Sequence, residues 1–266
     1  TNPIPRLISF TGSTAVGRHI GEIAGRNLKR VALELGGNSP FVVLSDADVD
    51  QAVNAAVFGK FIHQGQICMI VNRFIVHKDH YDEFVEKFVS RAKSLPYGNP
   101  SDPNTVIGPL INETQLKKAL SYIEEAKKEG ATLVLEGKRE GNVLTPFVFT
   151  NVKNSSKLAQ TEVFAPIATI IKAESDEEAI EMANDTEYGL SSSIFTSDLN
   201  RGEQLALSID SGMTHINDQT VNDAPNIPFG GNKGSGLGRF GNPWVVDEFT
   251  VTKWVSVQEK ERQFPF

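Results

Sequence analysis

Alternation between helical and strand-like stretches is the feature that most constrains the fold of this chain. Residues 6–10 read as a strand, a helical stretch runs to about Arg26, and an apolar run follows at 31–35. These three stretches predict a βαβ unit. Further strand-like runs among helical stretches stand at 73–77, 133–135, 167–171, 192–196 and 214–217. The alternation predicts an α/β fold with a mostly parallel sheet.

Two helix starts can be predicted from their capping residues. Ser45 or Asp46 is expected to cap the helix whose apolar positions recur through 49–61. Ser175 followed by Glu178 is a capping-box pattern, which predicts a helix start at that point.

The composition is that of a globular protein that acts on small molecules. The chain has 266 residues, of which 39% are hydrophobic and 22% charged, so it can bury a sizeable core. A net charge of -7 argues against a nucleic-acid partner, which would require a basic face. Neither a long apolar segment nor a basic-then-apolar start is present, so no membrane span or signal peptide is expected. The expected location is the cytoplasm.

Cys68 is the only cysteine of the chain, so it cannot form an intramolecular disulfide. On residue type alone, a free cysteine is a small buried hydrophobe without chemistry. Its setting favours another reading, because it follows the expected end of the helix at 49–61. Glu34 stands in a Glu-Leu-Gly-Gly turn that can bring a carboxylate near. A thiol beside a mobile carboxylate can act as a nucleophile and base pair.

Two glycine-rich stretches are candidates for phosphate binding. Residues 12–17 follow a strand and open a helix, so their amides could hold a phosphate, although an ordinary tight turn explains them equally well. Residues 230–239 carry several glycines but are expected to have no strand before them and no helix after them. A dinucleotide fingerprint requires that context, so this second stretch is expected to be a tightly folded loop.

Other candidate site residues are weaker. His77 and His80 are three residues apart without a set of further ligands, which favours a solvated surface pair over a metal site. No metal is therefore expected. Glu162, taken alone, reads as an exposed acid of a loop.

Four ordered segments together resemble the signatures of the NAD(P)-dependent aldehyde dehydrogenase superfamily. They are 34–40 (Glu-Leu-Gly-Gly-Asn-Ser-Pro), 65–68 (Gly-Gln-Ile-Cys), 162–166 (Glu-Val-Phe-Ala-Pro) and 228–236 (Pro-Phe-Gly-Gly-Asn-Lys-Gly-Ser-Gly). The resemblance covers essentially the whole chain but only the C-terminal part of such an enzyme. Within the family, the segments around Cys68 and at 218–228 are most similar to the branch that acts on aromatic aldehydes such as benzaldehyde and vanillin.

The resemblance implies a role for each matching residue. Cys68 would be the nucleophile that forms a thiohemiacetal and then a thioester, and its backbone amide would be one oxyanion donor. Glu34 would be the general base for hydrolysis. The cofactor, NAD or NADP, would lie with its pyrophosphate near Gly12 and Ser13. Its nicotinamide would lie near Leu35, its nicotinamide ribose would lie near Glu162 and Phe164, and Phe229 would wall the substrate pocket.

The resemblance also implies a bilobed architecture. Residues 1–36 would be the end of a Rossmann-like coenzyme-binding domain, 37–234 the catalytic domain, and 235–266 a return segment with an oligomerisation strand. The run 250–257 alternates like a half-buried strand. The family uses this segment in subunit pairing, so a homodimer or homotetramer is expected.

The chain departs from the family pattern at several points. The asparagine that completes the oxyanion hole and the lysine that holds the adenosine ribose would lie upstream of Thr1. Ile70 and Val71 stand where many relatives carry serine and threonine, and Ala165 replaces a common glycine. These departures concern the local loop and the ribose contact.

Three alternatives to the dehydrogenase reading follow from the same residues. One is a cofactor-independent thiol esterase that uses Cys68 and Glu34, and another is a non-catalytic fragment. A third is a relative that releases the acyl group to coenzyme A. Glu34 argues for water instead, because hydrolysis of a thioester needs a base poised beside it.

Overall fold

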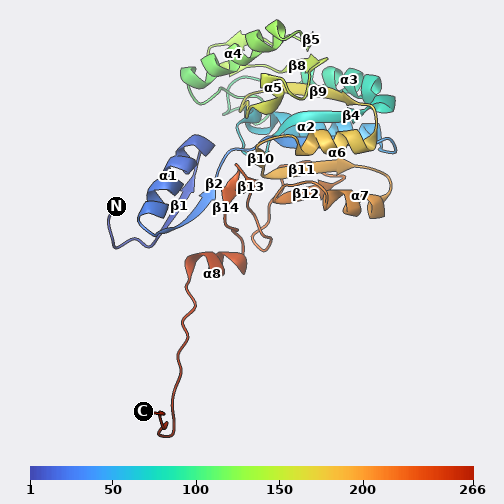
Figure 1. Ribbon diagram of the computed structural model, residues 1–266. Coiled ribbons are helices and arrows are strands. Elements are labelled where there is room, and N and C mark those ends of the chain that lie inside the picture. Colours follow the sequence, from blue (N-terminus) through green and yellow to red (C-terminus); the bar gives the residue numbers. More distant parts are fainter.

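The computed structural model describes residues 1–266 and contains two principal sheets (Figure 1). The smaller sheet has the strand order β1 (Leu7–Thr11), β2 (Arg30–Glu34) and β14 (Gly236–Leu237). β1 and β2 are parallel and joined by helix α1 (Thr14–Arg26), which confirms the predicted βαβ unit. β14 pairs antiparallel with β2, so the end of the chain returns to its beginning.

The larger sheet has seven strands and is mostly parallel, as predicted. In order across the sheet they are β12 (Met213–Ile216), β11 (Ser191–Phe195), β3 (Ser39–Val43), β4 (Val71–His77), β9 (Ile167–Ala173), β8 (Phe147–Thr150) and β5 (Thr132–Leu135). Only the outermost pair, β5 with β8, is antiparallel. The α/β class is confirmed.

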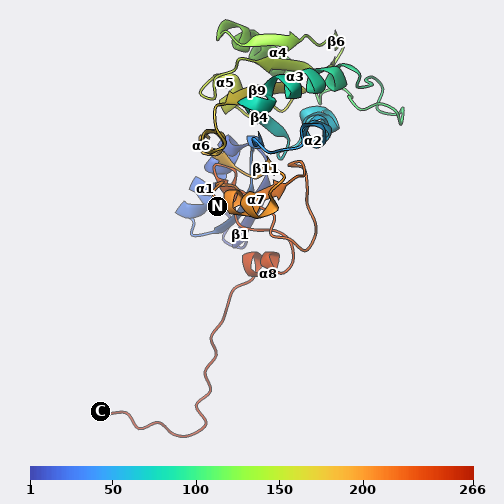
Figure 2. The ribbon, with the colours of Figure 1, turned by 90° about the vertical axis from the view of Figure 1, so that its right-hand side faces the viewer.

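Helices cover both faces of the larger sheet. They are α2 (Val49–Phe61), α3 (Lys78–Lys93), α4 (Glu113–Lys128), α6 (Asp176–Asn184) and α7 (Leu199–Ala206). Side chains of successive strand residues point to opposite faces, so Phe41 and Phe74 pack with α2 and α3, whereas Val42 and Ile75 pack with α6. Figure 2 shows α2 and α6 on opposite sides of these strands. Burial on both faces explains why β3 and β4 carry consecutive apolar residues at 41–43 and 74–76.

The remaining elements are short. They are the pair β6 (Arg139–Glu140) and β7 (Val143–Leu144), the pair β10 (Tyr188–Gly189) and β13 (Asn232–Lys233), the 3₁₀ turn η1 (Ile62–Gly65), and helices α5 (Lys157–Gln160) and α8 (Trp244–Phe249). None of the helices has both the length and the apolar character needed to cross a membrane.

The predicted cap of α2 is wrong by two or three residues. The capping residue is Asp48, whose side chain accepts a hydrogen bond of 3.0 Å from the amide of Gln51. Ser45 and Asp46 precede the helix, and Asp46 instead accepts the amide of Ser197 at 3.0 Å. Adjacent polar residues all suit a cap by type, and the first helical turn selects the one that can reach its free amides.

Two other local predictions have different outcomes. The cap at Ser175 is confirmed, since its hydroxyl accepts the amide of Glu178 at 3.2 Å. The solvated histidine pair is wrong, because His77 is buried at the end of β4. Its Nδ1 accepts the amide of Asp79 at 3.3 Å and so caps α3.

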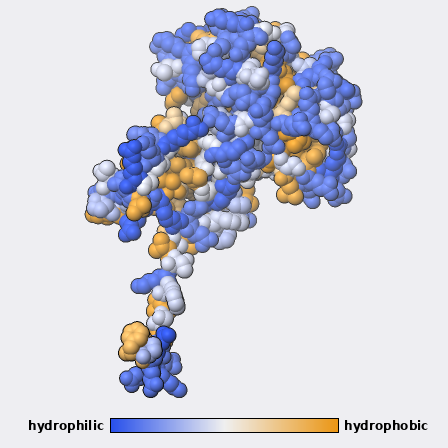
Figure 3. All heavy atoms as spheres, viewed as in Figure 1, coloured by the Kyte–Doolittle hydropathy of each residue, from blue (hydrophilic) through white to orange (hydrophobic).

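One of two predictions for the C-terminal part of the chain needs correction. The stretch 230–239 is not simply a loop, because it contains β13 and β14 and is followed by α8. Within this single chain the run 250–257 forms no strand, and residues 250–266 extend away from the body of the molecule (Figure 1), so the strand that pairs between subunits stays a prediction. A strand needs a partner, and within this chain the run has none. Figure 3 shows apolar side chains along this tail, and Trp254 is 89% exposed.

Candidate active site

The loop that carries Cys68 is shaped by a reversal after α2. His63 and Gln64 adopt left-handed conformations with φ of 51° and 47°, and Gly65 follows with φ of 77°. A side chain at Gly65 would not fit, because an ideal Cβ would lie 2.7 Å from the carbonyl carbon of Ala165. The reversal leaves Cys68 half-buried between the helix end and β4. The predicted position past a helix C-terminus is confirmed.

Glu34 is the last residue of β2 and is 7% exposed. Both of its carboxylate oxygens are buried without a hydrogen-bond partner. Burial raises the pKa of Glu34 to about 7, with Arg239 opposing the rise and Asp223 adding to it. A buried carboxyl without a fixed donor can exchange a proton near neutral pH, and no hydrogen bond holds it in one orientation.

The glycines after Glu34 bring three functional groups together. Gly37 lies against the carbonyl oxygen of Cys68 so closely that a Cβ would overlap it. The Gly37 amide donates to Glu162 Oε1 at 3.0 Å, and the Gly36 amide donates to Thr14 Oγ1 at 3.3 Å. The turn thus joins β2, the Cys68 loop and the segment that bears Glu162.

The thiol is half-buried and lies near the carboxyl groups of Glu162 and Glu34. Burial raises the pKa of Cys68 to about 11, and the charges of Glu162 and Glu34 act in the same direction. Hydrogen bonds from the backbone amides of Met69 and Cys68 oppose that rise. The thiol is therefore protonated at neutral pH and needs a base before it can attack a carbonyl group.

A cavity of about 420 Å³ opens beside these groups. It is lined by Thr11, Gly12, Ser13, Leu35, Gly36, Cys68, Gln115, Lys118, Glu162 and Phe164. Six of the eight predicted site residues lie in this lining, and Glu34 directly precedes it in the chain. Phe229 does not line the cavity, since it is half-buried in a bridge to Phe240.

The cavity has groups that suit a dinucleotide. Gly12 and Ser13 stand at the start of α1, a 13-residue helix without an acidic residue in its first turn, which favours a phosphate group. Oε1 of Glu162 accepts the hydrogen bond from the Gly37 amide, and Oε2 has no donor within the protein. Oε2 can therefore accept a hydrogen bond from a hydroxyl group of a ligand. Burial raises the pKa of Glu162, and the Gly37 amide opposes the rise.

Three residues of this site were not found from the sequence. Thr14 accepts the Gly36 amide and donates to the carbonyl of Gly234 at 3.0 Å. Gln115 Nε2 donates to the carbonyl of Phe164 at 3.0 Å, and Phe164 has a φ of 52°. Lys118 lies one helical turn beyond Gln115 in α4. The three-residue spacing of Gln115 and Lys118 is the only local signal for these two residues, and many exposed helix faces share such a spacing.

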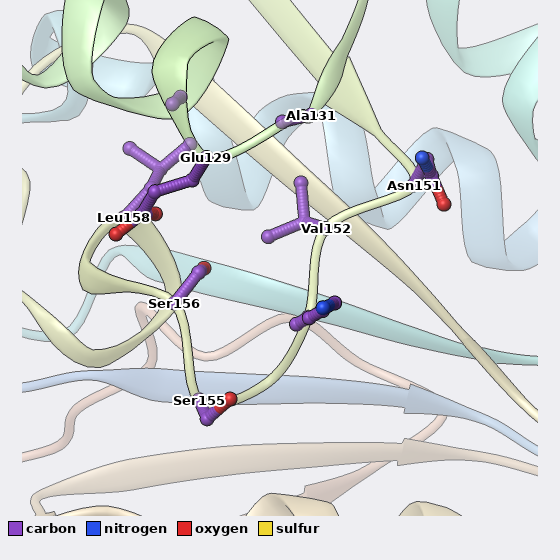
Figure 4. A pocket seen from close by; sticks show the side chains of 9 residues that line it. Glu129, Ala131, Asn151, Val152, Ser155, Ser156 and Leu158 are labelled. Carbon is purple, nitrogen blue, oxygen red and sulfur yellow. The ribbon is translucent and has the colours of Figure 1, made fainter.

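A second hollow lies apart from these residues. It has a volume of about 260 Å³ and lies between the end of α4 and the residues before α5, lined by residues such as Glu129, Asn151 and Ser156 (Figure 4). No predicted site residue lines it. No group of three or more histidine, cysteine, aspartate and glutamate side chains is placed to hold a metal ion.

Comparisons with known proteins extend over the whole chain. A model of the aldehyde dehydrogenase family matches residues 1–255. AldY of Bacillus subtilis (strain 168) is 75% identical over 266 residues, which cover 100% of this chain and 55% of AldY. Vanillin dehydrogenase of Corynebacterium glutamicum is 52% identical over 97% of this chain and 54% of that protein. The chain spans about half the length of the curated relatives it matches.

Solved structures give the same result for the fold. A salicylaldehyde dehydrogenase from Pseudomonas putida G7, solved with salicylaldehyde, has a TM-score of 0.94 and 42% identity over 98% of this chain and 54% of its own. An aldehyde dehydrogenase of Mycobacterium tuberculosis, solved with NAD+, has a TM-score of 0.90 and 40% identity over 93% of this chain and 52% of its own. The predicted fold family and the likeness to enzymes of aromatic aldehydes are confirmed.

Proposed function

The chain belongs to the aldehyde dehydrogenase family, and we propose that the protein containing these residues oxidises an aldehyde to its carboxylic acid with NAD or NADP. The observation that carries the proposal is the turn at Gly36 and Gly37. Its glycines directly follow Glu34 and contact both the Cys68 loop and Glu162, and Cys68 and Glu162 line one cavity. A nucleophile, a base and a cofactor-binding acid grouped at one turn are what this oxidation needs.

The first chemical step is attack of the Cys68 thiol on the aldehyde carbonyl. Because the pKa of the thiol is about 11, a base has to accept its proton as the bond forms. Glu34, with a pKa near 7, is partly ionised at neutral pH and can accept it. The Cys68 backbone amide would stabilise the oxyanion of the thiohemiacetal. NAD or NADP, when bound, supplies the hydride acceptor that lets this adduct become a thioester.

The second step is hydrolysis of the thioester. After releasing the first proton to solvent, Glu34 accepts a proton from water as the water oxygen attacks the thioester carbonyl. The carbon–sulfur bond then breaks and this proton passes to the sulfur, which leaves the Cys68 thiol and the carboxylic acid. The carboxylate of Glu34 can serve both steps because no hydrogen bond fixes either oxygen.

The cofactor would occupy the cavity between α1 and the Glu162 segment. Gly12 and Ser13 would hold its pyrophosphate, Leu35 would contact the nicotinamide, and Glu162 with Phe164 would bind the nicotinamide ribose. All five line the cavity, which supports this assignment. Phe229 would wall the substrate side, outside this cavity.

The substrate we propose is an aromatic aldehyde. Support comes from the relatives, since one is named vanillin dehydrogenase and another is solved with salicylaldehyde. We further propose a cytoplasmic homodimer or homotetramer in which the tail at 250–257 pairs with another subunit. The exposed apolar side chains of this tail support that pairing.

The domain division is part of the same proposal. Residues 1–36 would end the coenzyme-binding domain, 37–234 would be the catalytic domain, and 235–266 would return to the first. The pairing of β14 with β2 supports the last assignment, because it joins residues of the first and third segments in one sheet.

Steady-state kinetics tests the proposal. The protein containing these residues is assayed with benzaldehyde, vanillin and aliphatic aldehydes, each with NAD and with NADP, and reduced cofactor is followed. Reduction that depends on Cys68 and is faster with aromatic aldehydes is expected. Hydrolysis of p-nitrophenyl acetate without any reduction of cofactor would contradict the proposal and favour the thiol esterase.

A further inference from the structure

Thr220 is a buried residue that contacts the Cys68 loop from a distant part of the chain. Its side chain is fully buried, and Oγ1 donates to the carbonyl of Met69 at 2.5 Å. Met69 directly follows the nucleophile, so this hydrogen bond acts on the peptide chain beside the thiol. Neither sequence motifs nor the steps described above use Thr220.

The turn that carries Thr220 is held rigidly. Ser191 of β11 donates its hydroxyl to the carbonyl of Thr220 at 2.8 Å. The side chain of Gln219 donates to the carbonyl of Val221 at 3.0 Å and accepts the amide of the same residue. The turn can approach α2 closely because Gly59 has no side chain. A Cβ at position 59 would lie only 3.0 Å from the Cβ of Gln219. The direction of the Thr220 hydroxyl is therefore set by the sheet.

The Cys68 loop is held at two consecutive carbonyl groups. The Cys68 carbonyl packs against Gly37, and the Met69 carbonyl accepts the hydroxyl of Thr220. The amide of Ile70 donates to Ile67 at 3.1 Å and closes the loop as a turn. The Met69 amide lies in the peptide plane of the Cys68 carbonyl, and the Met69 carbonyl lies in the next plane. Holding both carbonyls therefore sets the direction of the Met69 amide, which donates a hydrogen bond to Cys68.

We propose that Thr220 is a positioning residue for the thiol: by holding the Met69 carbonyl, it turns the Met69 amide toward the sulfur of Cys68. A donated N–H stabilises a thiolate more than a thiol, so the amide makes the nucleophile easier to ionise. The significance for catalysis rests on the proposed role of Cys68. The positioning itself does not depend on that role, because it can be measured as the reactivity of the thiol without substrate or cofactor.

Alkylation by iodoacetamide measures this reactivity directly. Cys68 is the only cysteine, so the rate of alkylation between pH 6 and pH 11 reports this thiol alone. Thr220→Val keeps the shape of the side chain and removes the donor. We expect the rate at pH 8 to fall about threefold to tenfold, since half to one unit of pKa changes the thiolate fraction by that factor. The pH profile should move upward by the same amount, and Thr220→Ser should restore both.

A matched control is available in β9. Thr169 is fully buried and its hydroxyl has no partner, so Thr169→Val makes the same exchange away from the thiol. It should leave the alkylation profile unchanged. If Thr220→Val does not fold, Ser191→Ala loosens the Thr220 carbonyl and should shift the profile in the same direction by a smaller amount.

Two outcomes would overturn the positioning, and a third would overturn only the proposed function. An unchanged profile in Thr220→Val, or in Ser191→Ala where that variant replaces it, would show that the contact does not position the thiol. An equal change in Thr169→Val would show a general effect of the buried exchange. If Cys68→Ser retains dehydrogenase activity while Thr220→Val still shifts the alkylation profile, the positioning holds and the proposed function fails.

Discussion

Two carboxylates approach the same thiol from two regions of the molecule, and their surroundings differ. Glu34, at the end of β2, is buried with both oxygens unpartnered and has a pKa of about 7. Glu162, in the turn before β9, is fixed by the Gly37 amide and leaves one oxygen for the cavity. A carboxyl that can move and titrate suits proton transfer, whereas one held in place suits ligand binding. The same residue type thus supports two roles.

Removing the thiol should have the largest effect, because both carboxylates then face a group without nucleophilic chemistry. In Cys68→Ser we expect kcat for aldehyde oxidation to fall by about 10³-fold or more, since a serine hydroxyl without a dedicated activating partner is a poor nucleophile. Steady-state formation of reduced cofactor measures it, with Thr169→Val as a control that should keep full activity. Retained activity in Cys68→Ser would remove the basis for assigning either carboxylate.

Exchanging the mobile carboxylate should separate the two regions most clearly. In Glu34→Gln we expect steady turnover to fall by about 10²-fold to 10⁴-fold, the usual contribution of a general base. A single burst of reduced cofactor should survive, because hydride transfer precedes hydrolysis. Rapid-mixing kinetics measures burst and steady phases, and an equal loss in both would mean that Glu34 does not act chiefly on the thioester.

The stability of the folded chain should also report the burial of Glu34. A folded-state pKa raised from 4.5 to about 7 costs nothing below pH 4.5, where the group is protonated in both states, and the cost grows as pH rises to 7. The unsubstituted chain therefore loses stability between pH 4.5 and pH 8 that Glu34→Gln keeps. The difference in unfolding free energy, variant minus unsubstituted chain, should be about 2 to 3 kcal/mol larger at pH 8 than at pH 4.5. Urea unfolding at both pH values measures this, and Glu203→Gln, an exposed site on α7, should show no such gain.

Exchanging the fixed carboxylate should have the smallest effect. In Glu162→Gln we expect the Kd for NAD or NADP to rise about tenfold, as loss of one hydrogen bond to a charged group predicts. Titration of the cofactor by fluorescence measures it, and Glu34→Gln should bind the cofactor as before. A larger loss of cofactor affinity in Glu34→Gln than in Glu162→Gln would reverse the two assignments.

The sequence predicts the parts of this site that lie within one motif. Glu34 with its two glycines and Cys68 with Gly65 each form a local pattern, and the structure brings these patterns together. Gln115, Lys118 and Thr220 reach the site from segments without such a pattern, because their positions depend on how α4 and the turn after β12 pack.

The predicted cap of α2 is wrong because three polar residues compete for that position, and packing decides among them. The strand at 250–257 stays a prediction, because alternation describes a surface and not its partner, which would come from another subunit.

The antiparallel pair of β2 and β14 has a consequence for how the site comes into being. Gly236 pairs with Glu34, and the amide of Leu35 donates to the carbonyl of Ser235 at 2.9 Å. The residues around Glu34 are therefore synthesised long before the residues they pair with. Pairings between positions so distant in sequence form slowly, because a long loop has to close first. On the ribosome, the segment that carries Cys68 would emerge well before the strand that closes over Glu34. During refolding, helical structure should therefore return before the thiol acquires the reactivity of the native chain.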